Sequence, residues 1–83
     1  MSSTATIRTI LHLQQGERCT IKTIVGSGSI RQRLLDMGLL PKQEVFLKRI
    51  APGGSPIWIE ISNSQLALRR EEAAMVQVAN CSE

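Results

Sequence analysis

The stretch VFLKRIAPGGSPIWIEI, residues 45–61, decides the fold. In both of its arms apolar residues recur at alternate positions, which is the period of a strand that buries one face. The segment between the arms, Ala51-Pro-Gly-Gly-Ser-Pro56, predicts a turn because glycine and proline interrupt regular structure. The three isoleucines of the second arm must face the core, so Phe46 and Trp58 are expected on the outer face. The sequence therefore predicts an antiparallel hairpin that exposes two aromatic side chains.

The same alternation predicts three further strands, which comprise residues 17–25, 65–68 and 75–78. A turn at residues 62–64, in which Asn63 can adopt a positive φ, precedes the second of these strands. One helical turn at residues 69–74 precedes the last. Five short strands fit a small, strongly bent barrel, because closure of the sheet removes unpaired strand edges. The predicted fold class is all-β with a small helical content.

One short helix is predicted between the first two strands, over residues 29–39. Its apolar face comprises Ile30, Leu34 and Met37. Ser29 and Gln32 have the spacing of a capping box at its start. Gly38 is placed to take the left-handed conformation that ends a helix, and Pro41 prevents continuation.

Length and composition indicate one globular domain. The chain has 83 residues, of which 42% are hydrophobic and 20% are charged. We assign residues 6–78 to the domain, residues 1–5 to a disordered N-terminus and residues 79–83 to a loose C-terminal tail. No window approaches the roughly 18 consecutive apolar residues of a membrane span, and the first residues do not follow the pattern of a secretory signal. A cytoplasmic location without direct membrane insertion is therefore expected.

The two cysteines are expected to be free thiols, because disulfides are rare in a reducing cytosol. Cys19 alternates with Ile21 on the predicted strand and is read as a small core side chain. Cys81 falls in the expected tail. The sequence does not exclude a disulfide between them.

Catalytic and metal-binding residues are sparse. The chain has a single histidine, His12, and no spacing typical of a zinc site or of a nucleophile with its base. His12, Glu71 and Glu72 are weak metal candidates, but adjacent glutamates on a helix point about 100° apart and chelate poorly. We therefore expect no enzyme activity, no intrinsic metal site and no cofactor.

Three motifs resemble the ferrous-iron transport protein A family (FeoA). They are RLLDMGLLP at residues 33–41, APGGSPI at residues 51–57 and LALRREEA at residues 66–73. The resemblance extends from about residue 11 to residue 78. It implies an SH3-like five-stranded barrel and a cytoplasmic accessory protein. The implied partner is FeoB, a large membrane-embedded, GTP-binding ferrous-iron transporter, through its cytoplasmic portion.

The chain departs from the family pattern at three turns. Lys42 follows Pro41 where the family usually has glycine, and this costs about 1 kcal/mol if the turn is of type II. Asn63 replaces a second glycine, and Asn tolerates positive φ. The loop built on Gly53, Gly54 and Pro56 carries serine in place of the family's aspartate.

A binding surface is the main functional hypothesis. Its candidate residues lie on the helix and on the outer face of the hairpin, and are Arg31, Leu35, Leu39, Leu40, Phe46 and Trp58. Two structural interpretations stay open: the helix leucines can simply cover one end of the barrel, and residues 7–13 can shield Phe46. Exposed edges and leucines also make a homo-oligomer conceivable.

Two other functions compete with partner binding. The net charge of +3 suggests a nucleic-acid-associated barrel that uses Lys22, Arg31, Arg33, Lys48 and Arg49, although the basic residues are too few and scattered to make this the expectation. An SH3-like, metal-responsive module is the second alternative.

Overall fold

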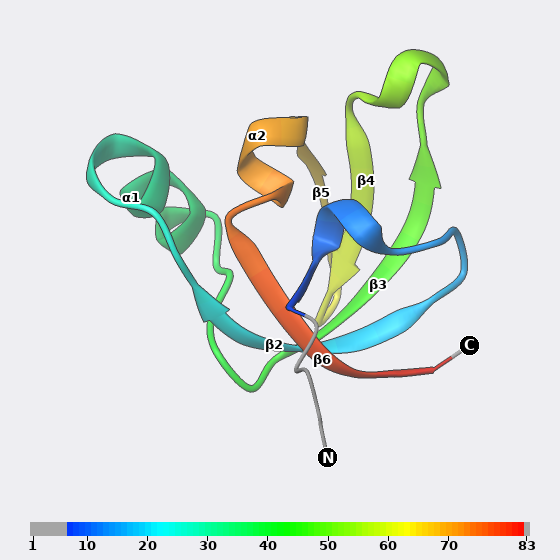
Figure 1. Cartoon of the computed structure of the whole chain (residues 1–83), viewed down its shortest axis with the longest axis horizontal. Helices are drawn as coiled ribbons and strands as arrows, with labels where there is room; N and C mark the ends of the chain where they lie inside the picture. Colours follow the sequence, from blue (N-terminus) through cyan, green and yellow to red (C-terminus); the bar gives the residue numbers. More distant parts are fainter. Residues whose placement is uncertain (1–6, 83) are drawn as a thin grey trace.

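The computed structural model describes residues 7–82. Its elements, in chain order, are β1 (Arg8–Thr9), the 3₁₀ turn η1 (Ile10–His12), β2 (Arg18–Ile24), α1 (Gly28–Asp36), β3 (Glu44–Ile50), the 3₁₀ turn η2 (Pro52–Gly54), β4 (Ile57–Ile61), β5 (Ser64–Leu68), α2 (Arg70–Ala73) and β6 (Val76–Ser82). The strands form one antiparallel sheet in the order β1-β6-β2-β3-β4-β5. Figure 1 shows this sheet bent around a core, with α1 set apart at one side. The predicted all-β, SH3-like class is confirmed.

The hairpin at residues 45–61 has the predicted orientation, and its ladder has a register shift between Leu47 and Arg49. Leu47 lies opposite Ile59, and both side chains are fully buried. Trp58 and Lys48 point away from the core, as the alternation predicts. Phe46 is half-buried opposite Glu60. The hairpin thus supplies both a wall of the core and the outer face on which the candidate aromatic residues lie.

The sheet has six strands rather than the predicted five. The additional strand β1 is two residues long, and Arg8 pairs with Val78 of β6. A segment this short has no alternation to detect. β6 continues to Ser82, beyond the predicted end at Val78, so residues 79–82, expected as a tail, belong to a strand. Residues 1–5, expected to be disordered, and Glu83 lie outside the described residues.

The last strand, β6, forms hydrogen-bonded ladders with two other strands. β6 lies between β1 and β2, whereas β5 at the opposite end pairs with β4 alone. Within residues 7–82 no ladder joins β1 to β5, so the barrel is incompletely closed by hydrogen bonds. The first and last parts of the chain therefore meet at one end of the sheet order, and the β4–β5 hairpin forms the other.

α1 begins and ends earlier than predicted. Ser27 is the N-cap residue and its side chain makes no capping hydrogen bond, so the predicted capping box of Ser29 and Gln32 is wrong. Ser29 already lies in the first turn, because the helix begins at the flexible Gly28. Gln32 instead donates to Asp36 at 2.9 Å on the exposed face, one helical turn away.

A Schellman motif ends α1 and explains the position of Leu39. Gly38 has φ of 97°, and its N–H donates to the carbonyl of Leu35 at 3.0 Å. The N–H of Leu39 donates to the carbonyl of Leu34 at 3.2 Å, which is the long hydrogen bond of this motif. Leu34 and Leu39 have no exposed surface. Leu39 therefore belongs to the core.

The turn after α1 places a lysine in a glycine-favouring conformation. The N–H of Gln43 donates to the carbonyl of Leu40 at 3.3 Å, and Lys42 at the third position has φ of 73°. Pro41 occupies the second position, as in a type II turn. The backbone has kept a positive φ although the side chain is not glycine.

Replacing Lys42 with glycine is expected to raise the free energy of unfolding by about 0.5–1 kcal/mol, because glycine avoids the steric cost of a Cβ at positive φ. Urea unfolding measures the effect as a higher midpoint with an unchanged slope. Lys48→Gly in β3 is the control and should destabilise, because glycine weakens a strand. Destabilisation by Lys42→Gly would contradict the turn described here.

The two remaining loops differ in how well their residues were anticipated. Gly53 and Gly54 have φ of 88° and 90°, and the loop ends at Pro56, as a glycine-proline turn predicts. Between β4 and β5, however, the positive φ of 49° falls on Ser62 and not on Asn63. The ladder ends at Ile61, so the loop has two residues and the unusual conformation is needed at the first of them.

Candidate partner-binding surface

Two of the three weak metal candidates, His12 and Glu72, make contacts within the fold. The Nδ1 atom of His12 lies 3.0 Å from the backbone N–H of Thr9, where it accepts a hydrogen bond. Glu72 is buried, its Oε2 is 3.0 Å from Nε of Arg33, and its Oε1 accepts from the N–H of Arg69 at 2.9 Å. Glu71 is exposed. The adjacent glutamates therefore serve different purposes and do not form a joint ligand pair.

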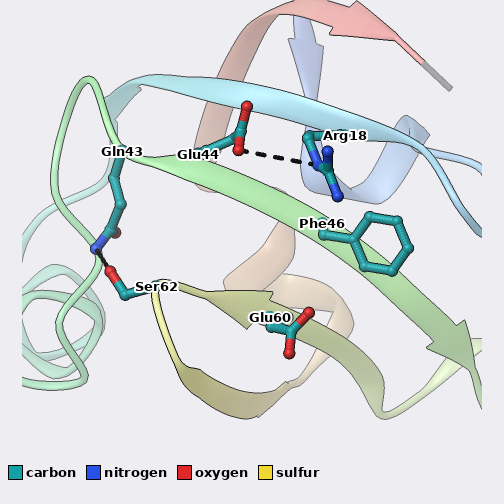
Figure 2. A pocket seen from close by; sticks show the side chains of 6 residues that line it. All are labelled: Arg18, Gln43, Glu44, Phe46, Glu60 and Ser62. Atoms are coloured by element: carbon teal, nitrogen blue, oxygen red, sulfur yellow. Dashed lines mark hydrogen bonds and ion pairs between the residues drawn. The ribbon is translucent and has the colours of Figure 1, made fainter.

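A shallow hollow of about 220 Å³ lies on the outer face of β2, β3 and β4. Figure 2 shows its lining residues, which are Arg18, Gln43, Glu44, Phe46, Glu60 and Ser62. The guanidinium of Arg18 lies over the ring of Phe46, 5.3 Å from its centroid, and is 3.9 Å from the carboxylate of Glu44. Such cation–π contacts orient an aromatic ring while leaving one face accessible.

The structure places the guanidinium of Arg18 beside the ring of Phe46. Residues 8–9 pair with β6 at the other end of the sheet order, and Arg8 forms an ion pair with Glu17 at 3.0 Å. The shielding of Phe46 by residues 7–13 stays an untested alternative.

A second hollow, of about 310 Å³, adjoins Trp58. Its lining comprises Lys48, Arg49, Trp58 and Gln65, so it combines one aromatic side chain with two cations. Trp58 is 37% exposed and lies opposite Arg49 of β3. This hollow differs in charge from the first, which contains two glutamates. The outer sheet face therefore offers two chemically distinct recesses beside its two aromatic residues.

α1 and the residues after it contribute fewer exposed side chains to the candidate binding surface than the sequence predicts. Arg31 is exposed and Leu35 is half-buried, whereas Leu39 has no exposed surface. Leu40, one position further, is 52% exposed. Because Leu39 cannot touch a partner without unfolding of the helix end, we leave it out of the surface that we propose.

Gln43 connects Leu40 to the first hollow and was not singled out from the sequence. Its Oε1 accepts a hydrogen bond from the N–H of Leu40 at 3.3 Å. Its Nε2 lies 3.5 Å from Oγ of Ser62 at the rim of the hollow. We define the docking surface as Leu40, Gln43, Phe46 and Trp58. A glutamine in a turn gives no sequence signal for such a bridging role.

The cysteines are paired in the structure. Cys19 is 1% exposed, as expected of a core residue, but it forms a disulfide with Cys81. The expectation of free thiols fails because β6 continues past Val78 and carries Cys81 along β2. Glu17 lies beside this pair: its carboxylate and the two sulfurs fall within 4.8 Å of one another. This cluster contains none of the metal candidates chosen from the sequence.

No helix within residues 7–82 is long and apolar enough to cross a membrane. The bent six-stranded sheet with its two short helices defines a small SH3-like domain. The model of one family, the FeoA domain, matches residues 8–80. The chain belongs to the FeoA family.

Three similar proteins illustrate the family. Over 66 residues the chain is 32% identical to the Fe(2+) transport protein A/Fe(2+) transporter FeoB fusion protein of Porphyromonas gingivalis; the match covers 80% of this chain and 8% of the fusion protein. The solution structure of iron(II) transport protein A from Clostridium thermocellum is 32% identical, with a TM-score of 0.81 and coverage of 86% of this chain and 44% of that one. The crystal structure of Stenotrophomonas maltophilia FeoA complexed with zinc has a TM-score of 0.81 at 23% identity and covers 92% and 96%.

Proposed function

We propose that this protein is a cytoplasmic accessory protein of bacterial ferrous-iron uptake, and that it acts by binding the cytoplasmic portion of the FeoB transporter. The observation that carries the proposal is the Porphyromonas gingivalis relative, in which the two kinds of protein are fused in one chain. Fusion holds two domains at high effective concentration, which serves a pair that works in contact. The chain spans only 8% of that relative, so the transport chemistry would reside in the partner.

The geometry favours contact over catalysis. The docking surface combines an exposed leucine with two aromatic side chains, and aromatic residues are enriched among those that dominate binding energies. Cationic and acidic recesses lie beside these residues and can fix the orientation of a partner. The structure pairs or exposes each candidate metal ligand chosen from the sequence, so we assign none of them a reaction.

Co-purification tests this proposal. Detergent-solubilised transporter should retain the wild-type protein in at least one of its nucleotide-free, GDP-bound or GTP-analogue-bound states. We expect Trp58→Ala and Leu40→Ala each to weaken retention by about tenfold or more, the scale of a binding hot spot. Val25→Ala is the matched control, since Val25 and Trp58 are equally exposed at 37% and Val25 lies outside the docking surface.

The outcomes separate the partner from the surface. No retention of the wild-type protein in any nucleotide state would overturn the proposed function. Retention that all three variants share equally would support the function and reject the docking surface. Each variant is checked for an unchanged thermal unfolding midpoint before it is compared.

The recess at Trp58 also raises the alternative of nucleic-acid binding, because Lys48 and Arg49 flank an aromatic side chain. We expect no such binding, since two adjacent cations do not make a basic stripe. A labelled single-stranded oligonucleotide provides the test. Binding that weakens steeply with salt and disappears in Trp58→Ala would establish the alternative.

A further inference from the structure

Glu17, Cys19 and Cys81 form a compact group of metal-ligating side chains that shares no residue with the docking surface. One ligand atom from each lies within 4.8 Å of the other two. Cys19 is buried, whereas Cys81 and Glu17 are half-buried, so the group is partly accessible to solvent. In the structure the two sulfurs are joined as a disulfide.

The backbone holds the two cysteines together independently of their bond. Cys19 lies in β2 opposite Val45 of β3, between two neighbouring strands. β6 follows β2 on the other side, and a register shift there coincides with Asn80, which has φ of 55°. This irregularity carries Cys81 to a position beside Cys19, with Cα atoms 4.0 Å apart. Two thiols produced by reduction would therefore remain neighbours.

The Glu17 carboxylate keeps a free acceptor position. Its Oε1 accepts from Nη2 of Arg8 at 3.1 Å and from the N–H of Gln14 at 3.0 Å. Its Oε2 accepts only from Nη1 of Arg8, at 3.0 Å. A carboxylate oxygen has two lone pairs, so one on Oε2 is unused.

We propose that the reduced protein binds a divalent cation that prefers sulfur ligands, namely Zn²⁺. The ligands are the two cysteine thiolates and the Glu17 carboxylate. Three protein ligands leave one position of a tetrahedral site open to water or to a further ligand. Two thiolates and one carboxylate with a zinc ion carry one net negative charge, and the guanidinium of Arg8 on the same carboxylate balances it. Arg8 does not bind the metal itself, but its ion pair orients the Glu17 carboxylate.

The disulfide is then the metal-free form of the same site. A dithiol reductant supplies two electrons and two protons, the Sγ–Sγ bond breaks, and the reductant becomes its own disulfide. Zinc binding releases the two thiol protons to solvent, because thiolates are the ligands. Zinc is expected to bind more tightly than ferrous iron, since thiolate ligands and the order of divalent affinities both favour it. The site is distinct from the docking surface and does not depend on the proposed function.

Zinc titration of the full chain tests the proposal. The protein is reduced and desalted under anaerobic conditions, and binding is measured by competition with a chromophoric chelator. We expect one zinc per reduced chain and none per chain oxidised with diamide. Cys81→Ser should weaken zinc binding by about tenfold or more, and Glu17→Gln should have a smaller effect. Glu44→Gln, which changes an exposed carboxylate on β3, should bind zinc like the wild type.

A second measurement uses the wild-type protein and therefore does not depend on the folding of a variant. Zinc should slow alkylation of the thiols in the reduced wild-type protein, and the slowing should disappear on adding a chelator. Equal zinc binding by the oxidised and reduced proteins, or no binding by the reduced protein, would overturn the proposal. So would zinc binding that Cys81→Ser, with a circular dichroism spectrum like that of the wild type, leaves unchanged.

Discussion

Leu39→Ala is expected to lower the free energy of unfolding by about 2–5 kcal/mol, the range for truncating a fully buried leucine. Leu39 has no exposed surface and follows the glycine that ends α1. Its truncation therefore opens a cavity and removes the apolar contact that accompanies a Schellman motif. Chemical denaturation monitored by Trp58 fluorescence measures the loss, which is a large fraction of the stability of a domain this small.

The neighbouring residue is the control for this prediction. Leu40 is 52% exposed, so Leu40→Ala should change the free energy of unfolding by no more than about 0.5 kcal/mol. The same substitution is expected to weaken partner binding. Equal destabilisation by the two variants would show that the helix end is not arranged as described.

Glu72→Ala is expected to destabilise the protein by about 1–3 kcal/mol, because the variant leaves two groups without their partner. The N–H of Arg69 loses its acceptor at the start of α2, and the guanidinium of Arg33 loses an ion pair that links α1 to α2. We expect an effect below that of breaking a fully buried pair, because the Arg33 side chain is 58% exposed and water can replace its contact.

Glu71→Ala is the matched control, since it removes the adjacent carboxylate from an exposed position in the same helix. Its effect should stay within about 0.5 kcal/mol. Thermal unfolding of both variants gives the comparison. If Glu71→Ala destabilises as much as Glu72→Ala, net charge in the first turn of α2 matters more than the specific contacts of Glu72.

The sequence predicts elements well where residues alternate over a long enough segment. The hairpin at residues 45–61 was predicted with the correct buried and exposed faces, because each buried isoleucine is separated from the next by one outward residue. The end of α1 was placed near its true position because Gly38 can adopt a positive φ that other residues avoid. The faces of a hairpin and the end of a helix can be predicted because residues close together in the sequence determine them.

Features that depend on distant parts of the chain could not be predicted. β1 exists only because β6 offers it a partner, and its two residues carry no pattern of their own. The pairing of Cys19 with Cys81 depends on how far β6 follows β2 and on the irregularity at Asn80. No property of residues 79–82 alone distinguishes a strand from a tail.

Only the part of the candidate surface that depends on local alternation could be predicted from the sequence. The alternation along β3 and β4 places Phe46 and Trp58 outside, and the structure agrees. Leu39 and Leu40 are identical side chains at adjacent positions, so only the path of the chain after Gly38 reveals which one is buried. The role of Gln43 depends on its contact with Ser62, nineteen positions away.

The order of strands in the sheet constrains how the protein can be made. β6 is synthesised after the other described elements, yet it is the partner of β1 and one of the two partners of β2. A nascent chain lacking residues 76–82 can form the β3–β4–β5 meander but has an unpartnered β1 and an open edge on β2. Folding of the whole domain therefore waits until residues 76–82 have been synthesised, and until then the nascent chain exposes a strand edge to proteases and chaperones.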